Sequence, residues 1–203
     1  MINGLRASAT LEVPNPGLHL TVRKAVMHDL RPILDLINDY AARGAMLPRT
    51  EFEMSEAIRD FMVVMRDDEL LGCGALHFYS PTIGEIRSLA VAERATTQGV
   101  GRRLVEALVA EANEYELHAV FAFTYVVEFF NKVGFHEVER GVLPLKAWKD
   151  CLRCPKFQAC DEVAVLRILR PGRWAEERPE PHGTGDPFIQ IPTPRNPWLL
   201  PPK

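Results

Sequence analysis

An acid and a base stand two residues apart in the stretch EIRSLAV, which begins at Glu85. Alternate residues of a strand share one face, so Glu85, Arg87 and Leu89 are predicted to point the same way. On a solvent-facing surface, Glu85 and Arg87 would form an ion pair that contributes little. In a cleft, Glu85 could take up a proton, directly or through a water, and Arg87 could bind a carboxylate through its bidentate guanidinium.

A paired-glycine loop, GVG at residues 99–101, follows this strand and opens a long helical pattern. The first turn of a helix leaves N–H groups without intrahelical partners and carries the positive end of the dipole. Residues without Cβ let such amides approach an anion. Arg102 and Arg103 add positive charge. The motif is weak alone and gains value from its place between strand and helix, but Leu104 replaces the third glycine of a dinucleotide-binding fingerprint.

The elements that position these groups follow from hydrophobic periodicity. Strands are predicted at 18–26, within 61–80 as a pair around the RDDE turn, and at 84–92, 118–126, 135–142 and 161–169. Helices are predicted at 29–44, with Asp29 as N-cap and Gly44 as stop, then near 55–61, at 99–116 and at 127–134. This order indicates a mixed α/β (α+β) fold without internal repeats.

The composition is that of an ordinary globular protein: 47% of the 203 residues are hydrophobic and 25% are charged. The net charge of −3 gives no reason to expect a nucleic acid or an anionic membrane as partner. No apolar run approaches the ~20 residues of a membrane span, and the N-terminus lacks the pattern of a secretory leader. A cytoplasmic location is therefore the default expectation.

Three regions are expected along the chain. Residues 1–17 have little periodicity and are interpreted as a loosely held lead-in, and residues 18–170 as the folded domain. From Pro171 onward nine of 33 residues are proline, which predicts an extended or disordered tail over 171–203 until it docks.

Cysteines are concentrated in one short segment, where Cys151, Cys154 and Cys160 form a C-x2-C-x5-C pattern. The favoured interpretation is three reduced thiols that pack a lid or form a redox-sensitive pair. The alternative is a structural zinc site, which needs a fourth ligand that Asp161, His136 or Cys73 could supply. Cys73 lies in a strand pattern and is interpreted as a small core residue rather than as a nucleophile.

Three motifs in this order resemble the GNAT superfamily of N-acetyltransferases. EIRSLAV and TTQGVGRRLVEAL are similar to that family's fourth strand and acetyl-CoA pyrophosphate loop, and VEFFNKVGFHEVE to its closing helix and strand. The resemblance covers roughly residues 18–170. It implies a mixed, mostly antiparallel central sheet flanked by helices, with acetyl-CoA as co-substrate. A homodimer is an expectation from the family alone.

The resemblance also implies roles for particular residues. Glu85 takes the place of the general base. The backbone expected to bind the pantetheine arm is that of Leu89, Ala90 and Val91. The amides expected to cradle the pyrophosphate are those of Gln98, Gly99, Val100, Gly101 and Arg102.

Two positions depart from the family pattern. Thr96 stands where the loop usually begins with Arg or Gln, so that phosphate contact is lost or taken over by Gln98. Phe130 stands where many members have the tyrosine that acts as general acid. Proton return to the CoA thiolate then comes from another group, from water, or is not needed.

The acceptor is predicted from two features. Arg49, in the loop between the first two helices, and Arg87 could bind the two carboxylates of glutamate, although Arg49 could equally be a solvated surface charge. The segment 143–165 resembles the C-terminal part of short, single-domain bacterial N-acetylglutamate synthases, and Lys146 within it could close over the acceptor. This resemblance implies acetyl transfer to the α-amino group of L-glutamate, the first step of arginine biosynthesis.

Two alternatives remain open at this stage. One is acetylation of a different amine, such as another amino acid, a polyamine or a protein N-terminus. Such acceptors would favour acidic recognition groups, whereas the candidates here are arginines. The other is a non-catalytic acyl-CoA-binding regulator or a metal-sensing module, suggested by Phe130 and the cysteine cluster.

Overall fold

A seven-stranded sheet forms the centre of the computed structural model, which describes residues 20–140, 143, 154–156 and 159–177. The strands are β1 (Leu20–Lys24), β2 (Phe61–Arg66), β3 (Glu69–Phe78), β4 (Ile83–Val91), β5 (Ala119–Thr124), β6 (His136–Glu137) and β7 (Val163–Ile168). They lie in the order β1-β2-β3-β4-β5-β7-β6. β4 and β5 run parallel, and the other neighbouring strands are antiparallel. The expected mixed, mostly antiparallel sheet is thus confirmed.

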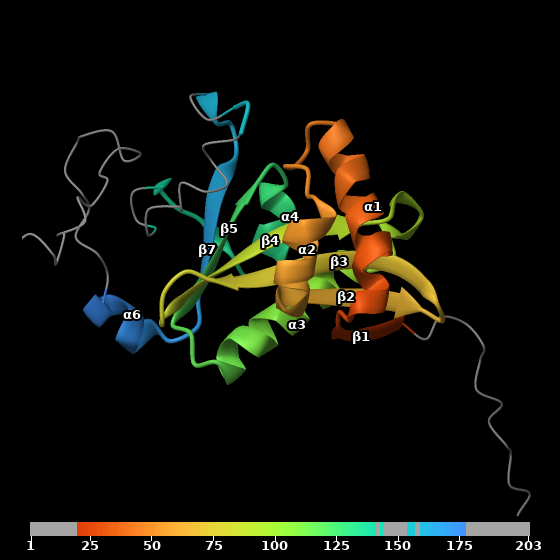
Figure 1. The fold of residues 1–203 in the computed structure, drawn as a ribbon. Coiled ribbons are helices and arrows are strands. Elements are labelled where there is room, and N and C mark those ends of the chain that lie inside the picture. The colour runs from red at the N-terminus through yellow and green to blue at the C-terminus, as the bar shows by residue number, and fades with distance from the viewer. Residues whose placement is uncertain (1–19, 141–142, 144–153, 157–158, 178–203) are drawn as a thin grey trace, which may run out of the picture.

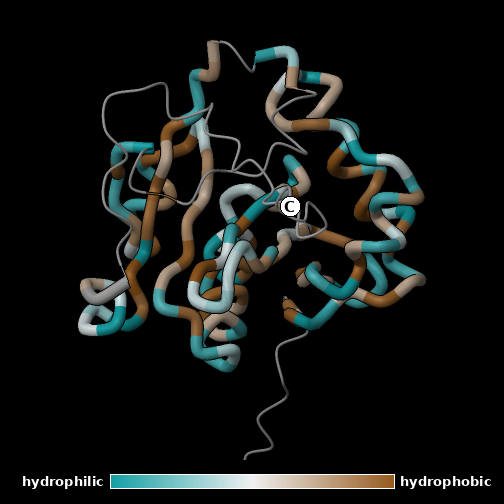
Figure 2. The backbone as a smooth tube through the Cα atoms, turned by 60° about the vertical axis from the view of Figure 1, so that its left-hand side comes forward, coloured by the Kyte–Doolittle hydropathy of each residue, from teal (hydrophilic) through white to brown (hydrophobic). Residues whose placement is uncertain are grey.

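Helices cover both faces of this sheet (Figure 1). They are α1 (Leu30–Ala42), α2 (Glu51–Ala57), α3 (Val100–Glu114), α4 (Val127–Lys132) and α6 (Pro171–Glu177). α1 and α2 pack on one face, and α3 and α4 pack on the other. The strands are largely hydrophobic along their length, whereas the helices alternate between hydrophobic and hydrophilic positions (Figure 2). The described residues include no helix with the length and apolar character that crossing a membrane requires.

The two long helices form where the periodicity predicts them. α1 buries Leu30, Ile33, Leu34 and Ile37, and α3 buries Val100, Leu104, Leu108 and Ala112. These spacings place the buried residues of each helix on one stripe, so each helix is held mainly by its apolar face.

Asp29 has a different role from the predicted one, because its side chain makes no capping bond to α1. Its carboxylate is only 3% exposed, and it accepts two hydrogen bonds from Arg23 at 2.6 and 2.8 Å and one from the Val26 N–H at 2.8 Å. The pairing with Arg23 lowers the pKa of this carboxyl, against an opposing effect of burial. Asp29 therefore pins β1 to the chain that enters α1.

Replacing Asp29 by asparagine is expected to destabilise the protein by about 1–2 kcal/mol at neutral pH, because charge-assisted hydrogen bonds are lost. Solvent screens the half-exposed Arg23, which limits the loss of stability. For a domain of this size the melting temperature should fall by about 2–8 °C. Since the folded-state pKa lies below the unfolded one, the contribution is present above about pH 4 and is lost as the pH falls through the folded-state pKa. Thermal melts of both proteins from pH 7 to pH 3 should converge at the acidic end, and a constant difference would contradict this account.

Helix α6 departs from the extended chain that the proline content predicts from Pro171 onward. Pro171 begins the helix, where the missing N–H of proline costs nothing. Trp174 is 7% exposed and packs in a cluster with Ile83, Phe121 and Leu143. Burial of this indole supplies the stabilisation that composition alone does not reveal. The predicted lead-in at 1–17 and the tail beyond residue 177 lie outside the described residues.

Candidate functional site

A β-bulge in β4 changes which residues share a face. Cys73 of β3 pairs with Ala90 and Ala75 pairs with Arg87, so Ser88 and Leu89 together oppose Gly74. Ser88 has φ 52°, in the left-handed region. Because two residues on β4 face one on β3, the alternation is reset at this point.

The bulge corrects the predicted orientation of Leu89. Ile86 packs in the core cluster under α3, so Glu85 and Arg87 point to the opposite face, which α1 and α2 cover. Leu89, beyond the bulge, packs against the α3 side, and Ala90 packs under α1. The predicted acid and base do share a face, whereas Leu89 lies across the sheet from them.

The same strand separates from its parallel neighbour. β4 and β5 pair from Ile83 with Ala119 to Glu85 with Phe121, and beyond these pairs the described parts of the two strands are not paired with each other. At the far end of β4, the Ala92 N–H donates to the Leu71 carbonyl at 2.8 Å. In an antiparallel ladder, this leaves the N–H and C=O of Val91 pointing away from β3, into the gap. The gap thus presents strand backbone of the kind that an amide-containing arm can bind.

The paired-glycine loop leads directly into α3. Gly99 has φ 75° and stands immediately before Val100, the first residue of the helix. A Cβ built on Gly101 would lie 3.2 Å from the ring of Phe129 in α4, so the helix start and α4 approach closely. The Arg103 N–H already bonds the Gly99 carbonyl, so the amides before it face outward at the helix start. This arrangement fits the predicted cradle for a pyrophosphate.

The side chains around this loop hold the loop itself. The side chain of Gln98 accepts from the Arg66 guanidinium and donates to the Arg94 carbonyl at 2.8 Å, and the Thr96 hydroxyl donates to the Glu93 carbonyl at 2.9 Å. If the Gln98 side chain bound the phosphate in place of residue 96, it would have to give up its two bonds to Arg66 and Arg94. Arg102 is exposed and pairs with Glu106 at 2.7 Å. The backbone amides are therefore the groups that remain available to an anion.

Glu85 lies buried at the base of the gap. It is 2% exposed, opposite His77 on β3 and Phe121 on β5. Cross-strand neighbours share a face, so His77 and Glu85 project from the same side of the sheet. His77 Nδ1 lies 3.2 Å from the Asp60 carboxylate. The sequence held no signal for the pair of His77 and Asp60, because His77 lies within an apolar strand pattern.

The predicted acceptor residues lie on the face covered by α1 and α2. Arg87 is half-buried there, and Arg49 precedes Thr50, the N-cap of α2. Asn38 of α1 fixes the loop by donating to the Arg49 carbonyl at 3.0 Å and accepting from the Arg49 N–H at 2.9 Å. Lys146 lies outside the described residues, so its predicted role stays a prediction.

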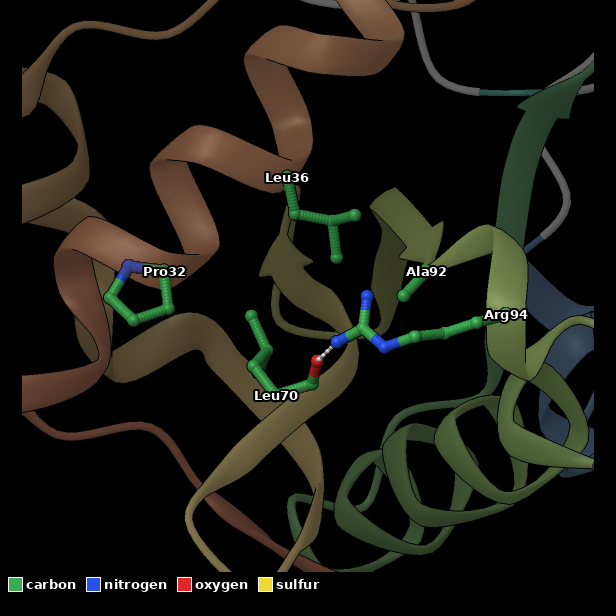
Figure 3. A pocket seen from close by; sticks show the side chains of 5 residues that line it. All are labelled: Pro32, Leu36, Leu70, Ala92 and Arg94. Atoms are coloured by element: carbon green, nitrogen blue, oxygen red, sulfur yellow. Dashed lines mark hydrogen bonds between the residues drawn. The ribbon is translucent and has the colours of Figure 1, made fainter.

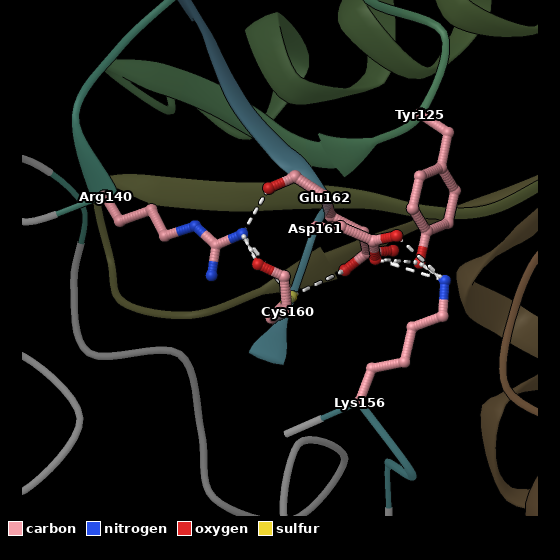
Figure 4. Close-up of polar contacts among 6 residues, drawn as sticks. All are labelled: Tyr125, Arg140, Lys156, Cys160, Asp161 and Glu162. Atoms are coloured by element: carbon pink, nitrogen blue, oxygen red, sulfur yellow. Dashed lines mark hydrogen bonds and ion pairs between the residues drawn. The ribbon is translucent and has the colours of Figure 1, made fainter. Parts of the chain in front are cut away.

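Polar contacts tie the cysteine segment to the end of β5 (Figure 4). Lys156 Nζ lies 3.1 Å from the Tyr125 hydroxyl and 3.0 Å from Asp161, and that hydroxyl donates to Asp161 at 3.0 Å. Lys156 lowers the pKa of the Asp161 carboxyl, and desolvation raises the pKa of Tyr125. The segment is therefore anchored beside the gap, and Tyr125 remains a protonated phenol at neutral pH.

The metal hypothesis for the cysteine cluster is not tested, because Cys151 lies outside the described residues. Within them, no group of three potential His, Cys, Asp or Glu ligands could hold a metal ion. Arg140 bonds the Cys160 carbonyl at 3.2 Å and lies 3.4 Å from its sulfur. Cys154 and Cys160 are free thiols.

Cys73 has the buried environment expected from the sequence, and Phe130 is buried as well. Cys73 is fully buried, and burial raises the pKa of its thiol to about 12, so no thiolate is available for nucleophilic attack. Phe130 is 3% exposed and packs edge-to-face on Phe129 and Phe135, with ring centroids at 5.3 and 5.1 Å. Its position in α4 therefore supplies packing and no proton donor.

A pocket of about 310 Å³ lies between α1 and the chain that leaves β4 (Figure 3). Its lining residues are Pro32, Leu36, Leu70, Ala92 and Arg94. The Arg94 guanidinium binds Glu69 at 2.6 Å and the Leu70 carbonyl at 3.2 Å. The lining has no carboxylate or imidazole for proton transfer, so we do not place the reaction there.

Comparison with solved structures agrees with this geometry. The chain superposes with a TM-score of 0.64 on Rv2747 from Mycobacterium tuberculosis, solved in complex with CoA; the two are 29% identical, and the match covers 73% of this chain and 99% of the other. The N-acetylglutamate synthase of Neisseria gonorrhoeae, solved with CoA and N-acetylglutamate, gives a TM-score of 0.67 at 27% identity over 75% of this chain and 36% of the other.

Proteins related in sequence are also named as acetyltransferases. An uncharacterized N-acetyltransferase of Chlorobaculum tepidum is 40% identical over 154 residues, which are 76% of this chain and 99% of that protein. An amino-acid acetyltransferase of Mycobacterium tuberculosis is 36% identical over 121 residues, covering 58% of this chain and 69% of that protein. Residues 28–135 match the acetyltransferase (GNAT) family. With the splayed strands and the glycine loop in place, the chain therefore belongs to the GNAT family of acetyltransferases.

Proposed function

We propose that this chain transfers the acetyl group of acetyl-CoA to the α-amino group of L-glutamate, the first step of arginine biosynthesis. The observation that carries the proposal is that a buried carboxylate, Glu85, and a guanidinium, Arg87, lie on the same face of β4, beside the gap expected to hold the thioester. Both point to the face where the α1–α2 loop holds Arg49. A relative named amino-acid acetyltransferase and a neighbour solved with N-acetylglutamate support this choice of acceptor.

The reaction is a direct transfer within a ternary complex. Glu85, or a water that it orients, takes a proton from the glutamate ammonium, and the nitrogen then attacks the thioester carbonyl. The C–N bond forms, the C–S bond breaks, and CoA leaves as the thiolate. The nitrogen loses its second proton to this thiolate, directly or through water, and the proton held by Glu85 returns to solvent. The Val91 N–H, which faces the gap, is suited to stabilise the developing oxyanion. A thiol with a pKa near 8.5 is a tolerable leaving group, so no tyrosine is needed at position 130.

The test is a CoA-release assay with acetyl-CoA and a panel of acceptors: L-glutamate, other amino acids, polyamines and peptides with free N-termini. The highest kcat/KM is expected for L-glutamate. Preference for another amine would overturn the choice of acceptor. Binding of CoA without release on any acceptor would favour the regulator alternative. Metal content measured on the same sample tests the zinc hypothesis.

Replacing Arg87 by glutamine is expected to raise the KM for L-glutamate about 10- to 100-fold, because a charge-assisted bond to a carboxylate is lost. The KM for acetyl-CoA should stay within about twofold. Arg87→Lys keeps the charge but not the bidentate guanidinium. Its KM for L-glutamate should therefore lie between those of wild type and Arg87→Gln. Arg59→Gln, at an exposed arginine between α2 and β2, is the control. An unchanged KM for glutamate in Arg87→Gln would remove this residue from the acceptor site.

A further inference from the structure

The hydroxyl of Tyr40 makes a hydrogen bond that neither the sequence motifs nor the proposed reaction accounts for. Tyr40 lies near the C-terminal end of α1 and is packed, half-buried, against the core on that face. Its Oη donates to the carbonyl of Val91, the last residue of β4, at 2.6 Å. This bond joins α1 to the strand that is expected to bind the pantetheine arm.

The Val91 carbonyl is the one that points into the gap between β4 and β5. A strand placed there would normally supply its hydrogen-bond donor, but β5 has already diverged from β4 at this level. A backbone carbonyl in a partly buried site needs a donor. Tyr40 supplies one from above the sheet, so the carbonyl is satisfied without the gap being closed. The carbonyl has a second lone pair, which stays available to an amide of the incoming arm.

Arg43, the residue that caps the C-terminal end of α1, braces this contact. The Arg43 guanidinium lies 4.4 Å from the centroid of the Tyr40 ring, and it pairs with Asp39 at 3.0 Å and with Glu93. Glu93 begins the short turn that leads from β4 toward Gly99. The last turns of α1 therefore hold both the end of β4 and the approach to the pyrophosphate loop.

The same helix also carries the residue that fixes the acceptor loop. Asn38 stands two positions before Tyr40 and makes both hydrogen bonds to the Arg49 backbone. One helical segment thus holds the acceptor loop through Asn38 and the cofactor strand through Tyr40.

We propose that Tyr40 is a positioning residue for acetyl-CoA. Its hydroxyl orients the Val91 peptide and keeps the end of β4 in the diverged geometry that admits the pantetheine arm. The inference rests on the acetyl-CoA site of the proposed function and is independent of the choice of glutamate as acceptor.

The test is Tyr40→Phe, which removes the hydroxyl and leaves the ring that Arg43 covers. Loss of one hydrogen bond should raise the Kd for CoA, measured by calorimetry without acceptor, and the KM for acetyl-CoA by roughly 2- to 10-fold. The KM for the acceptor and the pH profile of kcat should not change. Tyr115→Phe is the matched control, since that ring is 58% exposed at the end of α3, against Phe78.

Two outcomes would overturn the inference. One is an unchanged Kd for CoA together with a lower melting temperature, which would make Tyr40 a packing residue only. The other is an equal rise in KM for both substrates, which would mean that α1 as a whole has shifted. CoA binding is measured without an acceptor. The result can therefore be interpreted even if the acceptor is not L-glutamate.

Discussion

Replacing Glu85 by glutamine is expected to lower kcat for acetyl transfer about 100- to 1,000-fold near neutral pH, while the Kd for CoA stays within about twofold. The reason is that the amine reaches the site protonated and cannot attack until a base removes the proton, a contribution of about 10²–10⁴ in rate. Glutamine has nearly the same shape, so the packing of this 2% exposed side chain beside Phe121 is kept.

The pH dependence separates a base from a structural carboxylate. The deficit of Glu85→Gln should narrow as the pH rises, because the amine then loses its proton to solvent without help from the protein. Glu56→Gln, at an exposed position on α2, is the control and should behave as wild type. A kcat for Glu85→Gln equal to that of wild type across the pH range would refute the assignment of this base.

Replacing Gly99 by valine is expected to raise the KM for acetyl-CoA at least about tenfold. Gly99 has φ 75°, a conformation that costs an L-residue about 1–2 kcal/mol, and it stands directly before the helix start proposed to bind the pyrophosphate. The strained valine either shifts the amides of the first turn or places its side chain over them. Steady-state kinetics at saturating acceptor would measure the effect, with CoA binding measured alongside.

Gly44 provides a control with the same backbone strain away from the loop. It has φ 73° after the end of α1, and like Gly99 it has no neighbouring atom within 4 Å of a built Cβ. Gly44→Val should lower the melting temperature about as much as Gly99→Val and leave the KM for acetyl-CoA unchanged. If both variants changed this KM equally, the effect would be one of stability, and the loop would lose its assigned role.

Much of the fold could be predicted because the signals are local. The spacing of Ile33 and Ile37 in α1, and of Leu104 and Leu108 in α3, marks one helical face, and each helix formed there. The GVG loop likewise lies where it was predicted, between the turn that follows β4 and the start of α3. Asp29 was predicted as a cap from its position alone, and it instead binds Arg23, because a partner from β1 offers its carboxylate two charge-assisted bonds.

For the candidate site, the sequence proposed the residues, and the structure supplied the geometry that places them. Glu85 and Arg87 share a face because no irregularity lies between them. Leu89 lies across the sheet because the bulge at Ser88 intervenes. A bulge depends on how β4 pairs with β3, and a serine carries no local signal for a left-handed conformation.

The sequence by itself determined the family and indicated the glycine loop and the residue proposed as base, since these depend on residue types at short, fixed spacings. Only the tertiary structure decided that α6 forms with its Trp174 buried, that His77 pairs in register with Glu85, and that Tyr40 binds the Val91 carbonyl. Each of these contacts joins segments separated in the chain by many residues. Their energies come from burial and hydrogen bonds that exist only after the sheet and helices have packed.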